Sequence, residues 1–252
     1  MKELICMPKF WYIARIKYLN EQLQSMPDAR IGSHRGKIVV RVGNSSGFKQ
    51  IGPTSGEFSK FYDIAQLCEE LKGEMRSLIS EYEKNFMERF DINRLKCIPD
   101  FHYAGRMNLA YWEKLIDNEC PKEKKNQFPF NGHIFRSKIE REVAQAACEL
   151  HLSYKYDCGI KFAGDCVYTD LAFAFPEFDR CTLLEVLGRM GDVNYAMHNA
   201  SKLSNYALNG YMLNRDLFAL VGNEHYSPDA NTIKRQLVYM VQTICDSLSN
   251  SW

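Results

Sequence analysis

The chain has 252 residues, of which 46% are hydrophobic and 25% charged, and 32 basic residues against 31 acidic ones give a formal net charge of +1. These proportions are ordinary for globular proteins, so they exclude disordered, collagen-like and purely coiled-coil chains. The near-neutral total also excludes the strongly basic composition of a simple nucleic-acid binder, so any positive surface must be local.

The apolar runs and the spacing of cysteines and histidines exclude membrane-spanning and zinc-finger proteins. No apolar run approaches the roughly 18 residues that a membrane-spanning helix needs. The nine cysteines are scattered without a C-x-x-C pair, and the six histidines form no H-E-x-x-H motif. Such spacing is typical of free thiols in a reducing compartment rather than of zinc sites or disulfide frameworks. We therefore expect a cytoplasmic protein that does not enter a membrane.

The first part of the chain predicts a helix, a hairpin and a long helix. Amphipathic spacing indicates a helix over residues 8–24, and a β-branched run broken by glycines predicts a hairpin or small meander over 31–51. Helical spacing returns over 56–89, where apolar residues at 61–82 alternate steps of three and four and form a heptad seam. A seam this short is typical of packing within one chain, and a homodimer through it is the alternative.

Positive charge collects in the predicted hairpin. The stretch from Ala29 to Gly56 contains no Asp or Glu. Its basic residues are Arg30, Arg35, Lys37, Arg41 and Lys49. Because contacts to phosphates depend on the number of Lys and Arg side chains, this stretch predicts a nucleic-acid-binding surface. A solvated hairpin without a binding role is the alternative.

The second half predicts an alternating α/β core. Prolines punctuate residues 91–134, where we expect short helices and a linker, and we place the boundary between domains 1–127 and 128–252. The pattern beyond it is α-β-β-β-α-β-α. The predicted ranges are helix 136–150, strands 153–162, 167–175 and 181–187, helix 192–208, strand 216–221 and a helix from 229. One helix between the third and fourth strands predicts a mixed sheet flanked by helices.

Three acidic residues stand among apolar neighbours in this half. Glu140 lies on its first helix, at the edge of the apolar face, while Asp170 and Glu185 each interrupt an apolar strand. Burial of an unpaired carboxylate is costly. The three acids therefore predict a site for a divalent metal, which prefers carboxylate oxygens and promotes phosphodiester hydrolysis. The alternative is that each acid has its own partner within the fold. Glu140 would then form a capping box with Ser137, and the two strand acids would form salt bridges.

The flanks of these acids resemble the PD-(D/E)XK nuclease superfamily, and more closely a group of proteins from Firmicutes and their mobile elements. That group carries R-S-K-S-E on a helix, Y-P-D-F and W-E-H-x-G on two strands, then a Tyr and a K-L-x-x-Y helix. The corresponding stretches here are Arg136-Ser-Lys-Ile-Glu140, Tyr168-Thr-Asp-Leu171, Leu184-Glu-Val-Leu-Gly188, Tyr195 and Lys202-Leu-Ser-Asn-Tyr206. The resemblance implies an α+β or α/β fold, in which a helix–hairpin–long helix region precedes a restriction-endonuclease-like α-β-β-β-α-β core.

The resemblance also implies roles for single residues. Asp170 and Glu185 would bind Mg²⁺ or Mn²⁺, with the backbone carbonyl of Val186 as a further ligand. Glu140 would hold a water near the metal, and Arg136 would face a phosphate. The implied function is metal-dependent hydrolysis of phosphodiester bonds in DNA.

Two departures from the family pattern bear on catalysis. Leu187 stands where the superfamily has its catalytic Lys, and Val186 stands where the closer group has His. Lys202 on the next helix is our candidate for the missing lysine, with Lys161 as a second one and an exposed, functionless lysine as the alternative. If neither acts, the chain is a catalytically degenerate mobile-element protein. Such a protein would work by binding DNA or by inhibiting a host defence nuclease in the manner of an anti-CRISPR protein.

Overall fold

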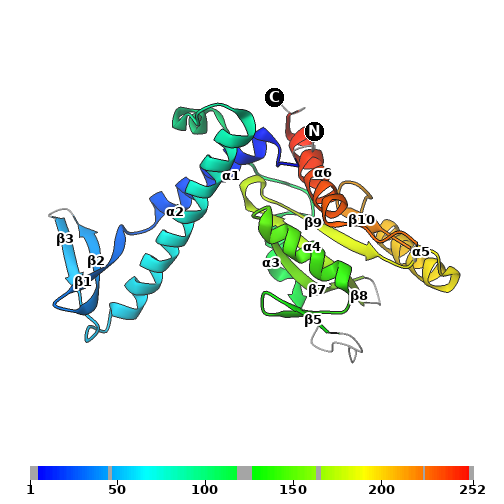
Figure 1. The fold of residues 1–252 in the computed structure, drawn as a ribbon, viewed down its shortest axis with the longest axis horizontal. Coiled ribbons are helices and arrows are strands. Elements are labelled where there is room, and N and C mark those ends of the chain that lie inside the picture. The colour runs from blue at the N-terminus through cyan, green and yellow to red at the C-terminus, as the bar shows by residue number, and fades with distance from the viewer. Residues whose placement is uncertain (1–4, 45–46, 118–126, 163–165, 224, 250–252) are drawn as a thin grey trace. The chain divides into compact units, whose positions relative to one another are not determined.

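The computed structural model describes residues 5–44, 47–117, 127–162, 166–223 and 225–249 (Figure 1). The fold is mixed α/β and divides into two compact units. The N-terminal unit is Lys9–Pro99, and the C-terminal unit is built from Asp100–Trp252 together with the residues before Lys9. Within the described ranges, no helix has the length and apolar character needed to cross a membrane. Cys120 lies outside those ranges, and the described cysteines are free thiols.

The N-terminal unit contains two long helices and a small sheet. Its elements are α1 (Lys9–Ser25), β1 (Ala29–His34), β2 (Lys37–Asn44), β3 (Gly47–Ile51), α2 (Phe58–Phe86) and the 3₁₀ helix η1 (Ile92–Cys97). The strands form an antiparallel sheet in the order β1-β2-β3, so the expected meander is confirmed. One face of this sheet packs on α2, where Ala29 and Val40 meet Ala65 in a small core.

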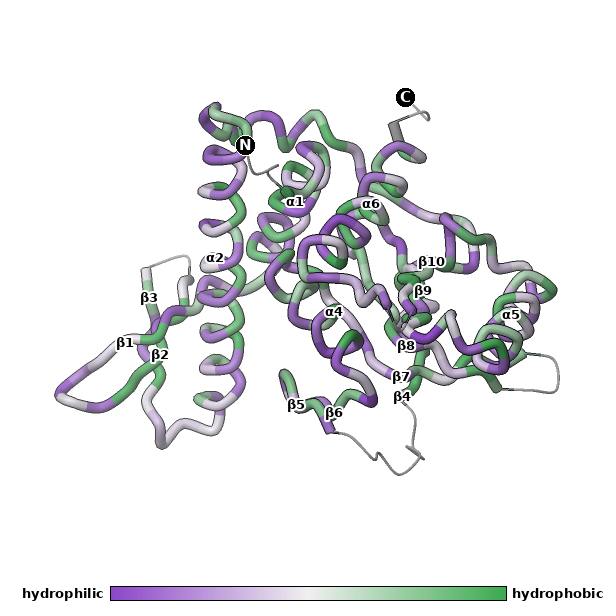
Figure 2. The backbone as a smooth tube through the Cα atoms, turned by 45° about the vertical axis from the view of Figure 1, so that its right-hand side comes forward, coloured by the Kyte–Doolittle hydropathy of each residue, from purple (hydrophilic) through white to green (hydrophobic). Residues whose placement is uncertain are grey.

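The heptad seam of α2 packs within the same unit. Leu78 and Tyr82 are fully buried, and the Tyr82 ring stands edge-on to Tyr12 of α1 with 6.2 Å between centroids. Beside them, Arg15 of α1 forms an ion pair with Glu74 of α2 at 2.8 Å. Hydrophobic and hydrophilic segments alternate along α2 (Figure 2), as expected for a helix with one packed face. A homodimer through the seam stays a prediction.

The C-terminal unit is built around a five-stranded sheet. Its elements are α3 (Leu109–Lys114), β4 (Ile116–Asp117), β5 (Phe128–Phe130), β6 (His133–Phe135), α4 (Lys138–Glu149), β7 (Ser153–Lys161), β8 (Cys166–Phe175), the 3₁₀ helix η2 (Pro176–Phe178), β9 (Arg180–Leu187), α5 (Val193–Leu208), β10 (Leu217–Val221) and α6 (Ala230–Ser249). The sheet order is β10-β9-β8-β7-β4, and β5 pairs separately with β6. Because β10 is parallel to β9 while the other pairs are antiparallel, the sheet is mixed, as predicted.

The predicted order of elements from α4 to α6 is confirmed, but the predicted boundary after residue 127 needs correction. Strand β4 pairs with β7, and α3 packs on β8 and β9. Residues 100–117 therefore belong to the C-terminal unit, which the contacts separate after Pro99. A strand of two residues has no periodicity that a sequence pattern can reveal, so this segment looked like a linker.

The central strands of the sheet are buried on both faces. Every residue of β9 is buried, as a strand covered by helices on both sides requires. On one face, Leu183 of β9 shares a core with Met107 and with Tyr206 of α5. On the other face, the Thr182 hydroxyl donates to the sulfur of Met240 of α6 at 3.1 Å. Since neighbouring side chains alternate, α5 covers the face that carries Leu183 and the residues in phase with it.

Candidate active site

Two of the three predicted acids lie where the pairing of β8 with β9 ends. Leu171 pairs with Leu184, and the next positions outward are Asp170 and Glu185. Beyond the last pair, one Asp170 oxygen accepts the backbone N–H of Val186 at 2.7 Å. Antiparallel register therefore brings together two carboxylates that are separated by fourteen intervening residues in the sequence.

The third acid approaches from the first turn of α4. Ser137 caps this helix, and its hydroxyl accepts the Glu140 backbone N–H at 3.2 Å. The Glu140 carboxylate accepts the Tyr156 hydroxyl at 2.7 Å and the Arg136 backbone N–H at 3.2 Å. Glu140 thus has part of the capping role, because its carboxylate accepts the backbone N–H of Arg136 just before the helix. The same carboxylate also borders the cavity.

All three acids line one cavity of about 580 Å³, which we call the carboxylate cavity. The exposed fraction is 7% for Glu140, 8% for Asp170 and 1% for Glu185. The described lining residues are Arg136, Glu140, Cys166, Val167, Tyr168, Asp170, Glu185, Val186, Tyr195, His198, Asn199, Ser201, Lys202 and Asn205. The structure therefore brings together every residue predicted as catalytic or metal-binding, together with Arg136.

Lys202 of α5 contacts the most buried acid. Its ammonium nitrogen lies 2.5 Å from one Glu185 oxygen, and the Tyr206 hydroxyl donates to the other at 2.7 Å. Both donors come from the same face of α5, since residues four apart share a helix face. Leu187, which the sequence analysis aligned with the catalytic lysine of the nucleases that the motifs resemble, is buried and in phase with Glu185 on β9. Lys202 brings a positive charge to Glu185 from the neighbouring helix.

Arg136 joins Asp170 to an acid that the sequence analysis missed. One guanidinium nitrogen lies 3.0 Å from Asp170 and another 3.2 Å from Asp157 of β7. Asp157 is buried and has φ +55°, which is left-handed backbone inside a strand, and its pair with Asp170 is missing from the ladder. Asp tolerates this conformation better than most residues, and such strain concentrates at functional sites.

The electrostatics of the cavity follow from this crowding of acids. Burial, followed by the charge of Asp170, raises the pKa of Glu185 to about 8 in spite of the Lys202 contact. The same two causes raise the pKa of Glu140 above its ordinary value. Burial opposes the charge of Arg136, but Asp170, Asp157 and Glu140 together raise its pKa. The cavity therefore favours additional positive charge.

The cavity offers carboxylate oxygens, the ligand type that hard divalent cations prefer. Arg136 and Lys202 offset only half of the charge that the four acids carry when ionised. Within the described part of the chain, no group of three or more His, Cys, Asp or Glu side chains is arranged to hold a metal ion. A cation would therefore depend on Asp170 and Glu185 with carbonyl and water oxygens, which is the sparse ligand set typical of Mg²⁺. The Val186 carbonyl accepts the Tyr195 hydroxyl at 3.4 Å, and both residues line the cavity.

The basic hairpin residues separate into two groups. The acids that border the acid-free stretch neutralise two of them, because Asp28 binds Arg30 at 3.0 Å and Glu57 binds Lys49 at 3.0 Å. Arg30 also lies 5.0 Å from the ring of Phe48. These contacts reduce the net positive charge that the sequence count suggested.

The remaining basic residues of the hairpin keep their charge uncompensated. Lys37 and Arg41 share the sheet face away from α2, and Arg35 lies in the β1–β2 turn with φ +49°. The Arg41 side chain passes over Gly32. A Cβ added to this glycine would stand 3.5 Å from the Nε atom of Arg41. Among the described residues, these three form no ion pair. They are the part of the predicted nucleic-acid surface that is able to meet phosphates.

Comparison with known proteins identifies no relative: no family model matches the chain, and neither the curated proteins nor the solved structures contain a similar one.

Two residues that contact the candidate site escaped the sequence analysis, and one predicted residue lies elsewhere. Tyr156 binds Glu140 and Asp157 binds Arg136, but in the sequence both belong to an ordinary strand pattern. The strand around Asp157 mixes polar and apolar residues, so this acid lacked the apolar neighbours that identified Asp170. Lys161, the second candidate for the missing lysine, lines a neighbouring cavity that does not contain the three acids.

Proposed function

We propose that this protein is a Mg²⁺-dependent endonuclease with a restriction-endonuclease-like core, which hydrolyses phosphodiester bonds in DNA. The observation that carries this proposal is the convergence of Glu140, Asp170 and Glu185, from three elements, on one cavity where Lys202 contacts Glu185. The resemblance of the flanking motifs to PD-(D/E)XK nucleases supports the same function.

Asp170 and Glu185 would hold the cation with help from the Val186 carbonyl. A bound Mg²⁺ supplies Lewis-acid polarisation of the phosphate and lowers the pKa of water. If Asp170 held a cation, it would give up its contact with Arg136, whose side chain is one-third exposed and could then meet a phosphate. A guanidinium suits this exchange because it binds carboxylates and phosphates with the same fork geometry.

Lys202 and Glu140 would carry the remaining charge and proton chemistry. The Lys202 ammonium stands at the cavity wall, where it stabilises negative charge that develops on the phosphate. Glu140, with a raised pKa and a hydrogen bond from Tyr156, accepts a proton from an attacking water more readily than an ordinary carboxylate. Tyr206 keeps Glu185 oriented while Lys202 moves between carboxylate and phosphate.

DNA is the proposed substrate because the N-terminal unit of the chain carries the face with Lys37 and Arg41. A few basic side chains give sequence-independent phosphate binding that weakens as salt is added. Cytoplasmic location, as expected from the composition, agrees with a nucleic-acid substrate.

A binding protein without catalysis is the second candidate function, and a specific contact favours it. Arg136 and Lys202 each bind one of the two proposed metal-binding acids, so the cavity is stabilised without a metal. A degenerate relative that binds DNA or a host defence nuclease would retain these contacts.

Cleavage and metal binding are measured together to test the proposal. Purified protein is incubated with supercoiled plasmid and single-stranded DNA in Mg²⁺ or Mn²⁺, and Mn²⁺ binding is followed by calorimetry. We expect nicking by the wild type, and loss of both nicking and Mn²⁺ binding in Asp170→Asn. Asp216→Asn is the matched control, because Asp216 is also buried but pairs with Arg215 outside the cavity. Absence of cleavage together with unchanged Mn²⁺ binding in Asp170→Asn would overturn the proposal.

A further inference from the structure

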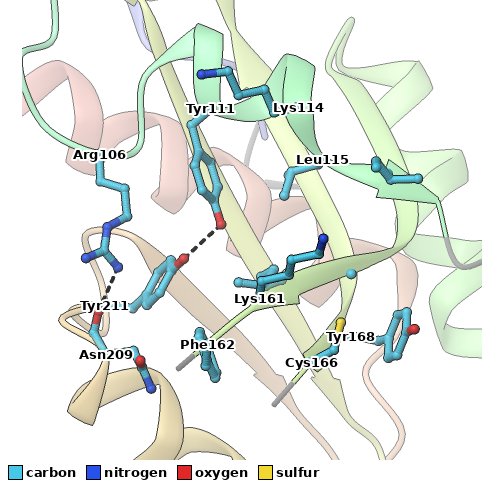
Figure 3. A pocket seen from close by; sticks show the side chains of 13 residues that line it. Arg106, Tyr111, Lys114, Leu115, Lys161, Phe162, Cys166, Tyr168, Asn209 and Tyr211 are labelled. Atoms are coloured by element: carbon cyan, nitrogen blue, oxygen red, sulfur yellow. Dashed lines mark hydrogen bonds between the residues drawn. The ribbon is translucent and has the colours of Figure 1, made fainter. Parts of the chain in front are cut away.

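A second cavity, of about 760 Å³, borders the carboxylate cavity in the C-terminal unit, and we call it the aromatic cavity (Figure 3). Its walls come from α3 and β4, from the paired strands β7 and β8, and from the segment after α5. Its principal lining residues are Arg106, Tyr111, Lys114, Lys161, Phe162 and Tyr211. Cys166 and Tyr168 line both cavities, so the two adjoin at β8. The volume is in the range of pockets that hold a small organic group.

The aromatic cavity is positively charged. Among its described lining residues, three are basic and none is acidic. Arg106 donates to the Asn209 carbonyl at 2.7 Å, and its guanidinium lies 5.0 Å from the Tyr211 ring, so its position is well defined. Lys114 and Lys161 are exposed. This lining favours an anion, whereas the adjoining carboxylate cavity favours a cation.

A rigid group of rings forms the opposite wall. Tyr211 stands 5.8 Å from Phe162 and 5.6 Å from Tyr206 between ring centroids, and its hydroxyl lies 2.8 Å from that of Tyr111. Figure 3 shows Tyr111 and Tyr211 joined by this hydrogen bond, with Phe162 beside them. Planar aromatic groups stack on such rings, and each stacked base contributes to the affinity of single-stranded nucleic acid.

Tyr168 connects this wall to the acids. It lies on β8 two positions before Asp170, and 38% of its surface is exposed. Its ring passes over Gly159 of β7, where an added Cβ would stand 3.3 Å from a ring carbon. Any side chain at position 159 would thus press on the ring, so glycine leaves room for Tyr168 where the two cavities adjoin.

We propose that the aromatic cavity binds one unpaired nucleotide of a DNA strand, whose backbone continues past Tyr168 into the carboxylate cavity. The rings supply a stacking surface for the base, and Arg106, Lys114 and Lys161 meet the backbone phosphate. A base inside a duplex has both faces covered, so it must leave the stack to enter. The cavity therefore selects single-stranded DNA or unpaired ends. The continuation of the strand rests on the proposed nuclease function, but the binding of an unpaired nucleotide does not.

The test measures binding without cleavage. Fluorescence anisotropy of the full chain with labelled single-stranded and duplex oligonucleotides in EDTA compares wild type, Tyr168→Ala and Lys114→Ala/Lys161→Ala. The exposed side chains of these variants avoid a folding defect, which thermal unfolding checks. Lys84→Ala/Lys96→Ala removes the same charge from the N-terminal unit, where both lysines are exposed. We expect an affinity loss of about tenfold for single-stranded DNA in both cavity variants, a smaller loss for duplex, and none in the control.

Two results would overturn the inference: equal losses for single-stranded and duplex DNA, or no loss in either cavity variant. Cleavage in Mg²⁺ separates this inference from the proposed function. If single-strand binding falls in the cavity variants while the wild type cuts no DNA, the proposed function fails and the inference stands. If the wild type cuts DNA and the cavity variants bind and cut as it does, the inference alone fails.

Discussion

The ammonium of Lys202 lies 2.5 Å from a carboxylate oxygen of Glu185, although sixteen residues separate them in the chain. Glu185 is the last acid of the candidate site and is 1% exposed, while Lys202 belongs to the helix that crosses from β9 to β10. In the proposed nuclease function, a lysine on this helix would take the place of the strand lysine that PD-(D/E)XK nucleases carry. Catalysis in the proposed mechanism depends on this contact.

Replacement of Lys202 tests directly whether catalysis depends on this contact with Glu185. Lys202→Ala should reduce DNA cleavage by about a hundredfold or more, because loss of one preorganised charge at a reacting centre has effects of that order. Lys202→Arg should retain part of the rate. The control is Lys234→Ala, since Lys234 also pairs with a glutamate at 2.5 Å but on α6 and α4, outside the cavity. Equal rates for Lys202→Ala and the control would contradict the role.

Arg136 should matter for stability as well as for phosphate contact. Arg136→Ala leaves Asp157 and Asp170 buried without their common cation, and we expect the free energy of unfolding to fall by about 2 kcal/mol. The expected loss is smaller than the loss on breaking a fully buried ion pair, because one-third of the arginine side chain is exposed. Urea unfolding measures it, and Asp157→Asn in the Arg136→Ala background should recover part of the loss. If the two substitutions change the free energy of unfolding by strictly additive amounts, the energetic coupling between Arg136 and Asp157 is refuted.

Glu185 predicts a pH dependence of folding in metal-free protein. Its folded-state pKa is raised to about 8 from the model-peptide value of 4.5, so between these values the folded state holds a proton that the unfolded state has lost. The free energy of unfolding should therefore decrease as pH rises through this window. Glu185→Gln should flatten the dependence, as measured by urea unfolding at about pH 5, 6.5 and 8. A steeper slope in the variant would contradict the prediction.

The sheet of the N-terminal unit should contribute to DNA affinity through its unpaired cations. Lys37→Ala/Arg41→Ala should weaken duplex binding and lower the slope of log affinity against log salt by about 2, one unit for each lost phosphate contact. Lys49→Ala is the contrast, because Glu57 already pairs with this lysine. Titrations at several salt concentrations give the slopes. An equal change of slope in the Lys37→Ala/Arg41→Ala and Lys49→Ala variants would contradict a phosphate-binding role for the face with Lys37 and Arg41.

The α2 seam should stabilise the fold of a single chain. Leu78 is fully buried in the unit that α1 and α2 share. Leu78→Ala should lower the free energy of unfolding by about 2–5 kcal/mol, the usual range for truncated core leucines. Light scattering should show the same molecular mass for both proteins. A halved mass in the variant would instead support the homodimer.

The order of the elements was accessible from the sequence because burial leaves a local record. The helical period identified α1, α2 and α4–α6, and apolar runs identified β7–β10, each close to its observed bounds. The same reasoning singled out Glu140, Asp170 and Glu185, because a carboxylate in an apolar segment has a cost that some partner must offset. Strand β4 was missed since its two residues are too few to show a period.

Partnerships between side chains became visible only in the tertiary structure. The sequence by itself determined the alternating core, its three acids and a local excess of basic residues. Folding decided that Arg136 bridges Asp157 and Asp170, and that Lys202 contacts Glu185. It also decided that Asp28 neutralises Arg30, which a count over the acid-free stretch could not show. The physical reason is that charges act over a few ångströms of space, and strand register and helix crossing set those distances independently of separation along the chain.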